Sequence, residues 1–416
     1  MTIVVRKYGG TSIATTEMIG RAAAYNKASY LSGIRLVLVT SAMGETTDQL
    51  LRCARKFGEF FAHRELDQLL ALGENASAAL MALALEGVGV PAVSLTAAQA
   101  GITVGGPHGT GVITGIDTAR INAALDEGRV VVVPGFQGMN PRQEVTTLGR
   151  GGSDTTAVAL AVALQGSRCE IHTDVDGVYT ADPRVVPVAR PLDRIAADVM
   201  ADFAWAGARV MHPRSIELAA MYGLDIHVKS TFSGRGTVIV GGPAKDLLEA
   251  GPAVVGIAHD PDVVDITVRR SATDRNVLTR LLQDILRRGI QIDLFGELTR
   301  DDHEREIVVT VRRTDVAHVE QVVRARLNCG MSAVRVDENL GKVSIVGMGL
   351  LSRPEYLGRA LPVLDAAHIA VKRISTSQAR VSMLVPLDRL TEAVRLLHEE
   401  LCPDRDDAEV STASSC

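Results

Sequence analysis

Residues 1–240 alternate short apolar runs with longer alanine-rich segments. The apolar runs have the length of strands, and the alanine-rich segments have the length of helices. Apolar runs lie at Ile34–Thr40, Val130–Pro134 and Asp225–Lys229, and alanine-rich segments lie at Ser77–Glu86, Ile116–Glu127 and Thr155–Gln165. Apolar strands separated by helices are typical of a mostly parallel sheet with helices on both faces. We therefore predict an α/β fold, a three-layer αβα sandwich.

A break rich in Gly, Pro and Ala at residues 241–254 separates this pattern from a second one. Beyond the break, the order strand, helix, strand, strand, helix occurs twice. In the first copy we expect strands at Val264–Arg269, Ile290–Leu294 and Glu306–Arg312 and helices at Arg275–Arg288 and Val316–Leu327. In the second copy we expect strands at Val343–Gly347, Ile369–Ile374 and Ala379–Val385 and helices at Tyr356–Ala367 and Asp388–Leu401. Two copies of about 60 residues indicate an internal duplication of a ferredoxin-like unit.

These patterns divide the chain into five parts. We expect a first domain at 1–245, a linker at 246–260, ferredoxin-like domains at 261–335 and 340–402, and a tail at 403–416. The tail is polar and then rich in Ser and Thr, so we expect it to be disordered.

Composition narrows the class of protein. The chain has 416 residues, 46% of them hydrophobic, and a net charge of −5, which together indicate two or three well-buried cores. The sequence contains no Lys/Arg block interleaved with aromatic residues, so we do not expect a nucleic-acid partner. It has no apolar run of about 18 residues and no leader pattern, so we expect a cytoplasmic protein without a membrane segment.

Cysteine and histidine do not point to a metal or redox centre. The five cysteines are far apart and form no CxxC pair, and the ten histidines are scattered. We therefore expect reduced cysteines and no transition metal held by the protein.

The first candidate for chemistry is KYGGTS at residues 7–12, at the end of the first predicted strand. In open α/β sheets the functional site lies at the carboxyl ends of the strands. Backbone N–H groups of a glycine turn can approach anionic oxygens closely there, and the Lys7 ammonium can neutralise their charge. Taken alone, the motif is equally compatible with an ordinary glycine turn beside an exposed lysine.

The second candidate is the loop Gly149–Asp154, which precedes an alanine-rich helix. Ser153 or Asp154 can cap that helix, whose N-terminus favours anions. Arg150 carries a planar fork of donors that suits a carboxylate.

The third candidate is TDVDGVYTADPR at residues 173–184, in a loop after the strand CEIHT. An acidic turn of this kind could bind calcium, but the glutamate at the end of an EF-hand loop is missing. A Walker P-loop pattern, GxxxxGK[ST], does not occur in the chain.

In this order and spacing, KYGGTS, TLGRGGSDTT at 147–156 and TDVDGVYTADPR resemble the amino acid kinase family and, within it, the aspartate kinases. VSIVGMG at 343–349 and ISTSQARVSMLV at 374–385 resemble ACT domains, which commonly bind amino-acid effectors. The resemblance implies the amino acid kinase fold followed by two ACT domains. It also implies transfer of phosphate from ATP, with Mg²⁺, to the side-chain carboxylate of L-aspartate.

The resemblance also assigns roles to residues. Lys7 and Asp154 match catalytic positions, with Asp154 orienting Lys7. The matched substrate-binding positions are Thr47, Glu74 for the α-ammonium, Arg150 for the α-carboxylate, Gly151, Gly152 and Ser153. The matched nucleotide-binding positions are Lys7, Tyr8, Gly9, Gly10, Ser41, Thr173, Asp174, Tyr179 near the adenine and ribose, Arg184 near the phosphates, and Arg209.

Several positions depart from the family pattern. Asn75 stands where an arginine is usual after the glutamate, and Arg209 replaces a lysine. In the ACT-like repeats, the turn at residues 271–276 lacks the usual proline and glycine. Arg353-Pro354-Glu355 replaces His-Pro-Gly, and Ala370 and Lys372 replace an asparagine and a glutamate. A cation in place of an acid repels a lysine effector, so we expect weakened lysine or threonine feedback.

Three further interpretations stay open at this stage. The chain could phosphorylate another small amino acid carboxylate, although Arg150 together with Glu74 favours an α-amino acid. It could be a non-catalytic amino-acid sensor that keeps the fold. We also expect a homodimer formed through the ACT-like domains.

Overall fold

The computed structural model describes residues 2–58, 63–231, 234–242, 253–271, 277–287, 290, 292–299, 304–327 and 334–402. The chain divides into two compact units. The first contains Met1–Val178, Pro191–Ala204 and Arg209–Leu248, and the second contains Tyr179–Arg190, Trp205–Ala208 and Glu249–Cys416. Two short segments from within the expected first domain therefore cluster with the second unit.

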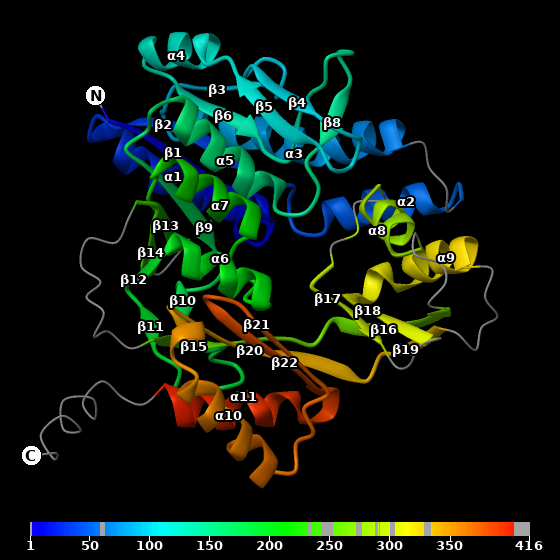
Figure 1. Cartoon of the computed structure of the whole chain (residues 1–416). Helices are drawn as coiled ribbons and strands as arrows, with labels where there is room; N and C mark the ends of the chain where they lie inside the picture. The colour runs from blue at the N-terminus through cyan, green and yellow to red at the C-terminus, as the bar shows by residue number, and fades with distance from the viewer. Residues whose placement is uncertain are drawn as a thin grey trace, which may run out of the picture. The chain divides into compact units, whose positions relative to one another are not determined.

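The first unit is built on an eight-stranded sheet with the order β12-β14-β13-β9-β1-β2-β6-β3 (Figure 1). Neighbouring strands are parallel, except that β13 and β14 are antiparallel. The strands are β1 (Ile3–Tyr8), β2 (Arg35–Thr40), β3 (Ala92–Ser94), β6 (Val130–Pro134), β9 (Arg168–Thr173), β12 (Arg194–Ala196), β13 (Ile226–Ser230) and β14 (Gly236–Val240). This confirms the predicted mostly parallel sheet.

Helices cover both faces of this sheet. On one face, Val4, Leu38 and Val132 form a buried apolar cluster with residues of α1 and α3. On the other face, α5 packs on β1, β2 and β9 (Figure 1). The helices are α1 (Thr16–Leu31), α2 (Thr46–Arg55), α3 (His63–Gly87), α4 (Ala119–Asp126), α5 (Gly152–Ala163), α6 (Ala197–Ala206) and α7 (Pro213–Tyr222), with a 3₁₀ turn at Gly10–Ile13. The three-layer sandwich is confirmed.

A small second sheet in the first unit was not predicted. Its order is β5-β4-β7-β8, with β4 (Ile102–Gly105), β5 (Val112–Ile116), β7 (Gln137–Met139) and β8 (Val145–Thr147). Strand β8 leads directly into the loop Gly149–Asp154. Separately, β10 (Val178–Tyr179) and β11 (Pro191–Leu192) form a two-stranded ladder.

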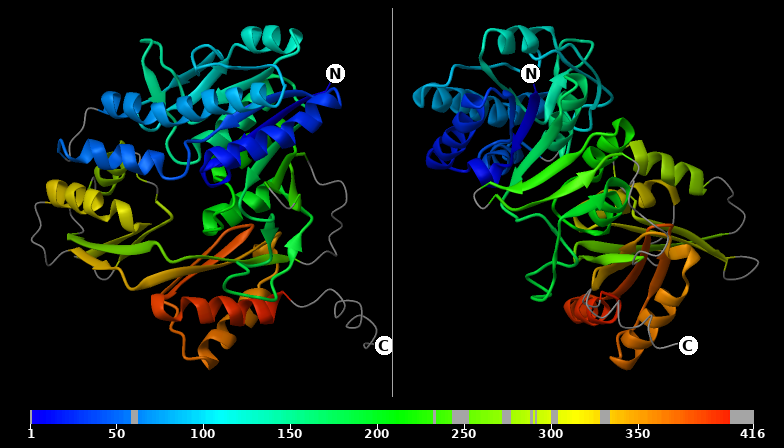
Figure 2. Two further views of the ribbon diagram at one scale, coloured as in Figure 1. Left: turned by 180° about the vertical axis from the view of Figure 1, so that it is seen from behind. Right: turned by 90° about the vertical axis from the view of Figure 1, so that its left-hand side faces the viewer.

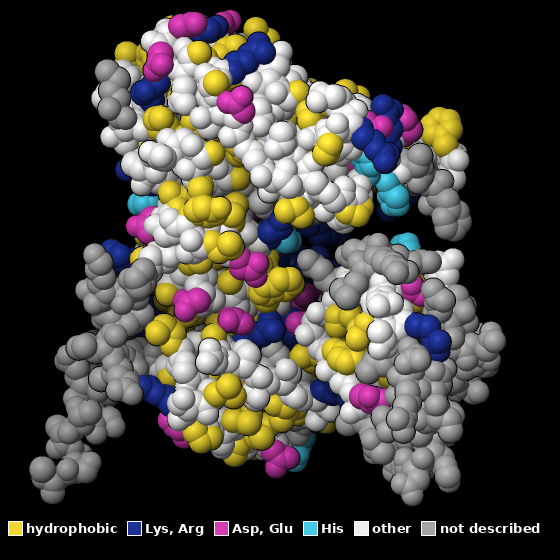
Figure 3. Space-filling view, turned by 45° about the horizontal axis from the view of Figure 1, so that its top comes forward, with side chains coloured by type: hydrophobic (Ala, Val, Ile, Leu, Met, Phe, Trp, Pro, Cys, Tyr) yellow, Lys and Arg dark blue, Asp and Glu magenta, His cyan; other side chains and the backbone are white. Residues whose placement is uncertain are grey.

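Helix α3 is much longer than the predicted helix at Ser77–Glu86. By length and composition alone it could cross a membrane, but half of its most apolar window is buried inside the protein. It packs against α1 and β6 and contributes Met81 and Leu85 to the core. These are the properties of a core helix. Over the face drawn in Figure 3, the Lys and Arg side chains are interspersed with Asp and Glu.

The second unit contains two four-stranded sheets, each with two helices on one face (Figure 2). The first has the order β17-β18-β16-β19, with β16 (Val263–Ser271), β17 (Leu294–Thr299), β18 (Glu304–Arg312) and β19 (Val334–Asp337), and helices α8 (Val277–Arg287) and α9 (Val316–Leu327). The second has the order β15-β20-β22-β21, with β15 (Val254–Asp260), β20 (Leu340–Gly347), β21 (Arg373–Thr376) and β22 (Arg380–Pro386), and helices α10 (Glu355–Ala366) and α11 (Leu390–Leu401). The predicted ferredoxin-like duplication is confirmed.

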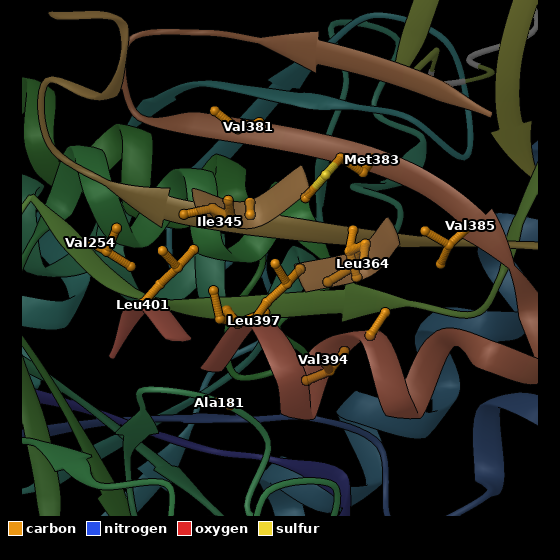
Figure 4. Packing of buried hydrophobic residues seen from close by; sticks show 14 of the residues in the cluster. Ala181, Val254, Ile345, Leu364, Val381, Met383, Val385, Val394, Leu397 and Leu401 are labelled. Atoms are coloured by element: carbon orange, nitrogen blue, oxygen red, sulfur yellow. The ribbon is translucent and has the colours of Figure 1, made fainter. Parts of the chain in front are cut away.

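The division between the two repeats differs from the prediction. Strand β15 lies within the range expected as a linker, yet it pairs with β20 and completes the second sheet. Its Val254 packs with Leu397 and Leu401 of α11 (Figure 4). The first repeat, β16 to β19, is therefore inserted between β15 and the rest of the second repeat. The tail 403–416 and most of the turn at 271–276 lie outside the described residues.

Candidate active site

Lys7 and Asp154 form an ion pair at the carboxyl end of β1. The Lys7 Nζ lies 2.6 Å from Asp154 Oδ1, and both side chains are only 12% exposed. A charged group that is removed from water needs a partner of opposite charge, and Lys7 and Asp154 are each other's partner here. Two motifs separated by 147 residues in sequence (154 − 7) thus meet in space.

Glycines at positions 9 and 10 create room around this pair. A Cβ on Gly9 would lie 3.6 Å from the Lys7 Nζ, so the missing side chain leaves one side of the ammonium open. A Cβ on Gly10 would lie 2.7 Å from the carbonyl oxygen of Ala42, which real structures do not tolerate. The turn after β1 can therefore pack tightly against the loop after β2, and Gly44 N donates to Gly10 O at 3.1 Å.

The glycine loop leads into α5 without a side-chain cap. Gly151 occupies the N-cap position with φ of 70°, and no side-chain hydrogen bond caps the helix. A Cβ there would lie 2.1 Å from the Cβ of His212, so only glycine fits both the backbone angle and the space. The expected capping by Ser153 or Asp154 is wrong, because both lie in the first helical turn. Asp154 is instead paired with Lys7. Gly152 N donates to Gly149 O at 3.1 Å, so the N–H groups that this helix start can present to an anion are those of Ser153 and Asp154.

The remaining loop residues differ in exposure. Arg150 is exposed and Ser153 is buried, with Gly135 packed against it. Gly152 is buried between Phe136 and Leu148. Thr47 is partly exposed in the first turn of α2.

Glu74 is a buried carboxylate with one oxygen unpaired. Its side chain is on α3, and the residue is 4% exposed. Gly73 lets the helix approach Ala42, where a Cβ would lie 2.8 Å from the Ala42 Cβ, and Ala42 N donates to Glu74 Oε1 at 3.1 Å. Oε2 has no hydrogen-bond partner among the described residues. Burial raises the pKa of Glu74 to about 7, although the Ala42 N–H opposes the rise. A buried, unsatisfied acceptor of this kind is suited to a cationic ligand group.

The assignment of Tyr8 to the nucleotide stays a prediction, and the burial of its side chain limits any such contact to the backbone. Tyr8 is fully buried in the core beside α1, and its ring stacks on His172 at a centroid distance of 4.8 Å. Asn26 Nδ2 donates to its hydroxyl at 2.8 Å, and burial raises the pKa of this phenol. Successive side chains of a strand point to opposite faces, so Tyr8 faces away from Lys7. Only its backbone remains near the site, where Ser41 N donates to Tyr8 O at 3.1 Å.

Thr173 and Asp174 follow β9 at the same edge of the sheet. In the β1–β9 ladder Tyr8 is opposite His172, so Thr173 lies beside the glycine turn. Thr173 Oγ1 donates to Asp174 Oδ1 at 3.0 Å, and Asp174 is exposed. The loop motif after β9 and the glycine turn after β1 therefore share one edge, as predicted for a phosphate site.

The other residues assigned to the nucleotide are Tyr179, Arg184 and Arg209. Tyr179 and Arg184 belong to the second unit, and their assignment to the nucleotide stays a prediction. Arg184 is 86% exposed and pairs with Asp182 at 2.7 Å. Arg209 is an exposed residue of the first unit, three positions before His212.

Two side chains that support the glycine loop were missed in the sequence. Asp67 of α3 and Arg214 of α7 are bonded to backbone atoms of residues 109–111 and 147–148. The one available signal was that Asp67 lies seven residues before Glu74, on the same face of one helix.

No protein-held metal centre is found within the described part of the chain. Its residues include no group of three His, Cys, Asp or Glu that could hold an ion. Cys53, Cys169 and Cys402 are free thiols.

The fold and these motifs define a class of protein. The sequence matches the amino acid kinase family over residues 2–230, more than half of its length, and an ACT domain over residues 343–401. The chain belongs to the amino acid kinase family.

Similar proteins are aspartokinases. The aspartokinase of Mycolicibacterium smegmatis is 39% identical over 419 residues, which cover 100% of both chains. That of Mycobacterium tuberculosis is 40% identical over 96% of each chain. A solved structure of E. coli aspartokinase III in complex with aspartate and ADP matches with a TM-score of 0.77 and 25% identity, covering 96% of this chain and 100% of that one.

Proposed function

We propose that this protein transfers the γ-phosphoryl group of ATP to the side-chain carboxylate of L-aspartate and produces 4-phospho-L-aspartate. The observation that carries the proposal is Glu74. Its buried Oε2 has no partner among the residues that the structure describes, and it lies at the edge of the sheet that also carries the Lys7–Asp154 pair. An amino acid ammonium supplies the missing partner. The similarity to aspartokinases, one of them solved with aspartate and ADP, supports the choice of substrates.

The substrate is held at its α-carbon in this proposal. Glu74 accepts hydrogen bonds from the α-ammonium, and the cation lowers the pKa of Glu74 so that the carboxylate is ionised in the complex. Arg150 binds the α-carboxylate through its planar fork. Thr47, Gly151, Gly152 and Ser153 line the rest of this site. With both α-groups fixed, the side-chain carboxylate is directed at the phosphate.

The reaction needs no protein nucleophile. An oxygen of the aspartate side chain attacks the γ-phosphorus, a new P–O bond forms, and the bond from the γ-phosphorus to the β,γ-bridging oxygen breaks with release of ADP. Lys7, held by Asp154, neutralises charge on the transferring group, and the first-turn N–H groups of α5 add donors. Magnesium enters with ATP as part of the substrate in this proposal.

The nucleotide is bound, in this proposal, by residues at the ends of β1, β2 and β9. The turn Gly9-Gly10 and the backbone of Tyr8 approach the phosphates, and Ser41, Thr173 and Asp174 flank them. Tyr179, Arg184 and Arg209 complete the set that the family pattern assigns.

The first test is ADP release with Mg-ATP and L-aspartate. The Lys7→Ala variant should lose about 10³-fold in kcat, because a charge aimed at the transferring phosphoryl is removed. Lys27→Ala, on the exposed side of α1, is the matched control and should keep full activity. Turnover with another amino acid but not with aspartate would move the substrate assignment. No turnover with any amino acid, together with amino-acid binding, would favour the sensor.

We also propose that feedback by lysine or threonine is weak. Lys372, where the family pattern has an acid, pairs with Asp337 and lies 3.6 Å from Asp265 Oδ2. A cationic effector would meet an ammonium at this point, and the usual turn Asp-x-Pro-Gly is absent from the first repeat. Strong inhibition by lysine plus threonine below the millimolar range would contradict this part of the proposal. The cytoplasmic location and the homodimer stay predictions, and light scattering of the purified chain tests the latter.

A further inference from the structure

We propose that Asp67 is a positioning residue that sets the distance between Arg150 and Glu74, and so governs affinity for the amino acid but not for the nucleotide. This inference rests on the proposed function. Asp67 itself touches no reacting group in this proposal. It acts through the loop that precedes Arg150.

Asp67 is a buried carboxylate with four bonds to loop atoms. It is 1% exposed and lies near the start of α3. Its Oδ2 accepts from Gly109 N and Thr147 N, both at 3.0 Å, and lies 2.9 Å from His108 Nδ1. Its Oδ1 accepts from Thr147 Oγ1 at 2.6 Å. A buried charge persists only when it is paired and bonded in this way, so the loop and the helix are fixed to each other.

The loop is also held by Arg214. Arg214, in the first turn of α7, donates to Leu148 O at 3.0 Å and to Gly111 O at 2.8 Å. Gly111 N donates to Thr147 O at 2.8 Å, which joins the two loop segments. Thr147 and Leu148 are the residues immediately before Gly149 and Arg150. An anion from α3 and a cation from α7 therefore fix the base of the loop that carries Arg150.

Helix α3 carries Asp67 and Glu74 on one face. Their separation of seven residues is two helical turns, or about 10 Å along the axis. Both side chains are buried, and neither can move without the helix. The same rigid helix thus places the carboxylate for the α-ammonium and, through Asp67 and Thr147, the arginine for the α-carboxylate.

This spacing matters because the two ligand groups share one carbon atom. A displacement of Arg150 by about 1 Å relative to Glu74 prevents both from binding at once, and misplacements of this size cost about 10²-fold. The nucleotide turn after β1 has no bond to Asp67 among the described contacts, so its binding should be unaffected.

The test is the Asp67→Asn variant. The amide keeps the size of the side chain but presents N–H groups to the donors of Gly109 or Thr147. We expect KM for L-aspartate to rise 10- to 100-fold, with KM for ATP within twofold and kcat reduced no more than threefold. Thr147→Val, which removes only the hydroxyl, should raise KM for aspartate three- to tenfold. The matched control is Asp126→Asn, at an exposed aspartate of α4, which should change neither KM for aspartate nor KM for ATP.

A double-mutant cycle separates positioning from a structural role. If Asp67 acts through Arg150, Asp67→Asn should have almost no further effect on KM for aspartate in an Arg150→Ala background. Inhibition by β-alanine, which lacks the α-carboxylate, should be equal in the wild type and Asp67→Asn. Additive effects, or equal rises in both KM values, would overturn the proposal. If Asp67→Asn does not fold, Thr147→Val gives the same cycle.

The wild type is measured first, which distinguishes the two proposals. If it phosphorylates an amino acid other than aspartate, the proposed substrate is wrong, and the cycle is run with the accepted amino acid. An unchanged KM for that amino acid in Asp67→Asn would overturn the role of Asp67 alone.

Discussion

Two loops that the family pattern assigns to the active site are held by different parts of the molecule. The loop before α5, which carries Arg150, is fixed within the first unit by the buried charges of Asp67 and Arg214. The segment Tyr179–Arg190, which carries Tyr179 and Arg184, belongs to the second unit. The first loop is held by polar bonds to its backbone, and the second mainly by apolar packing.

The packing of Tyr179–Arg190 is extensive. Ala181 and Val186 are buried in the same cluster as Val254 of β15 and Leu397 of α11 (Figure 4). Ile257 N donates to Thr180 O at 2.7 Å. Arg395 Nε donates to Val185 O at 2.8 Å. A change in the second unit can therefore reach two proposed nucleotide contacts, Tyr179 and Arg184, whereas the proposed amino-acid contacts belong to the first unit.

Among the variants that separate the two loops, Glu74→Gln should have the largest effect, and it alters only the binding of the amino acid. Loss of a charged hydrogen-bond partner for the α-ammonium costs about 3 kcal/mol, or about 100-fold in kcat/KM for L-aspartate. KM for ATP should stay the same. Glu86→Gln, an exposed residue of the same helix, is the control and should behave as the wild type. A rise in KM for ATP as large as that for aspartate would remove the distinction between the two loops.

We also expect Glu74→Gln to change how the free energy of unfolding depends on pH. Burial raises the pKa of Glu74 to about 7, so the folded protein holds a proton that the unfolded chain releases above a pKa of about 4.3. Holding this proton stabilises the folded protein. The stabilisation is complete below the pKa of Glu74 in the unfolded chain and is lost as pH rises through about 7. Without substrate, urea unfolding should show Glu74→Gln gaining about 2 kcal/mol relative to the wild type between pH 5 and pH 8. An unchanged difference across this range would contradict the raised pKa.

A moderate effect is expected from Thr180→Val, which alters the nucleotide side. Thr180 Oγ1 lies 2.9 Å from His398 Nε2 and accepts from Arg190 N at 3.0 Å. Without the hydroxyl, His398 Nε2 and Arg190 N lose this partner, which lowers the free energy of unfolding by about 1–2 kcal/mol. The segment Tyr179–Arg190 should then be held less firmly by the rest of the second unit. We expect KM for ATP to rise about threefold at constant KM for aspartate, checked by initial rates at saturating co-substrate. Thr114→Val, at an exposed threonine of β5, is the control. A selective rise in KM for aspartate would invert the comparison.

The pattern of apolar and polar residues was sufficient to predict the layers, and the resemblance to the family implied the central ion pair. Val130–Pro134 was predicted as a strand and forms β6 with the same bounds, because a buried parallel strand is apolar at every position. Lys7 and Asp154 meet because both lie at the carboxyl edge of the sheet, where the fold brings distant motifs together.

Some predictions from the sequence were wrong because apolar alternation shows that residues are buried but does not by itself show that they form a strand. Ile369 and Val371 pack in the core of the second repeat, yet no strand forms until Arg373, so their alternation indicated burial only. Strand β15 was assigned to a linker because its partner, β20, lies more than 80 residues later in the chain. Asp67 could not be recognised for the same reason, since its bond to Thr147 spans 80 residues. For Tyr8, the alternation of side chains across β1 directs the ring into the core, which the motif alone did not indicate.

The smallest effect should come from Lys372→Met, inside the second unit and remote in sequence from both loops. Its ammonium pairs with Asp337 of β19, and this hydrogen bond holds the pKa of Asp337 below its usual value, against the opposing effect of burial. Stability from the pair is present above the unfolded pKa of about 4 and is lost as pH falls through the lower folded value. The pair is partly exposed, so its removal should cost no more than about 1 kcal/mol at pH 7 and less at pH 3.

Urea unfolding of Lys372→Met at both pH values checks this prediction, and Arg373 remains to pair with Asp265 at 3.0 Å. Lys56→Met, at an exposed lysine of the first unit, is the control. Neither KM should change, because the Tyr179–Arg190 segment is held by β15 and α11 and not by the contact of Lys372 with β19. A rise in KM for ATP without a loss of stability would mean that the junction between the two repeats communicates with the nucleotide loop directly. The second unit would then act on catalysis through its own internal ion pairs as well as through the segment that it holds.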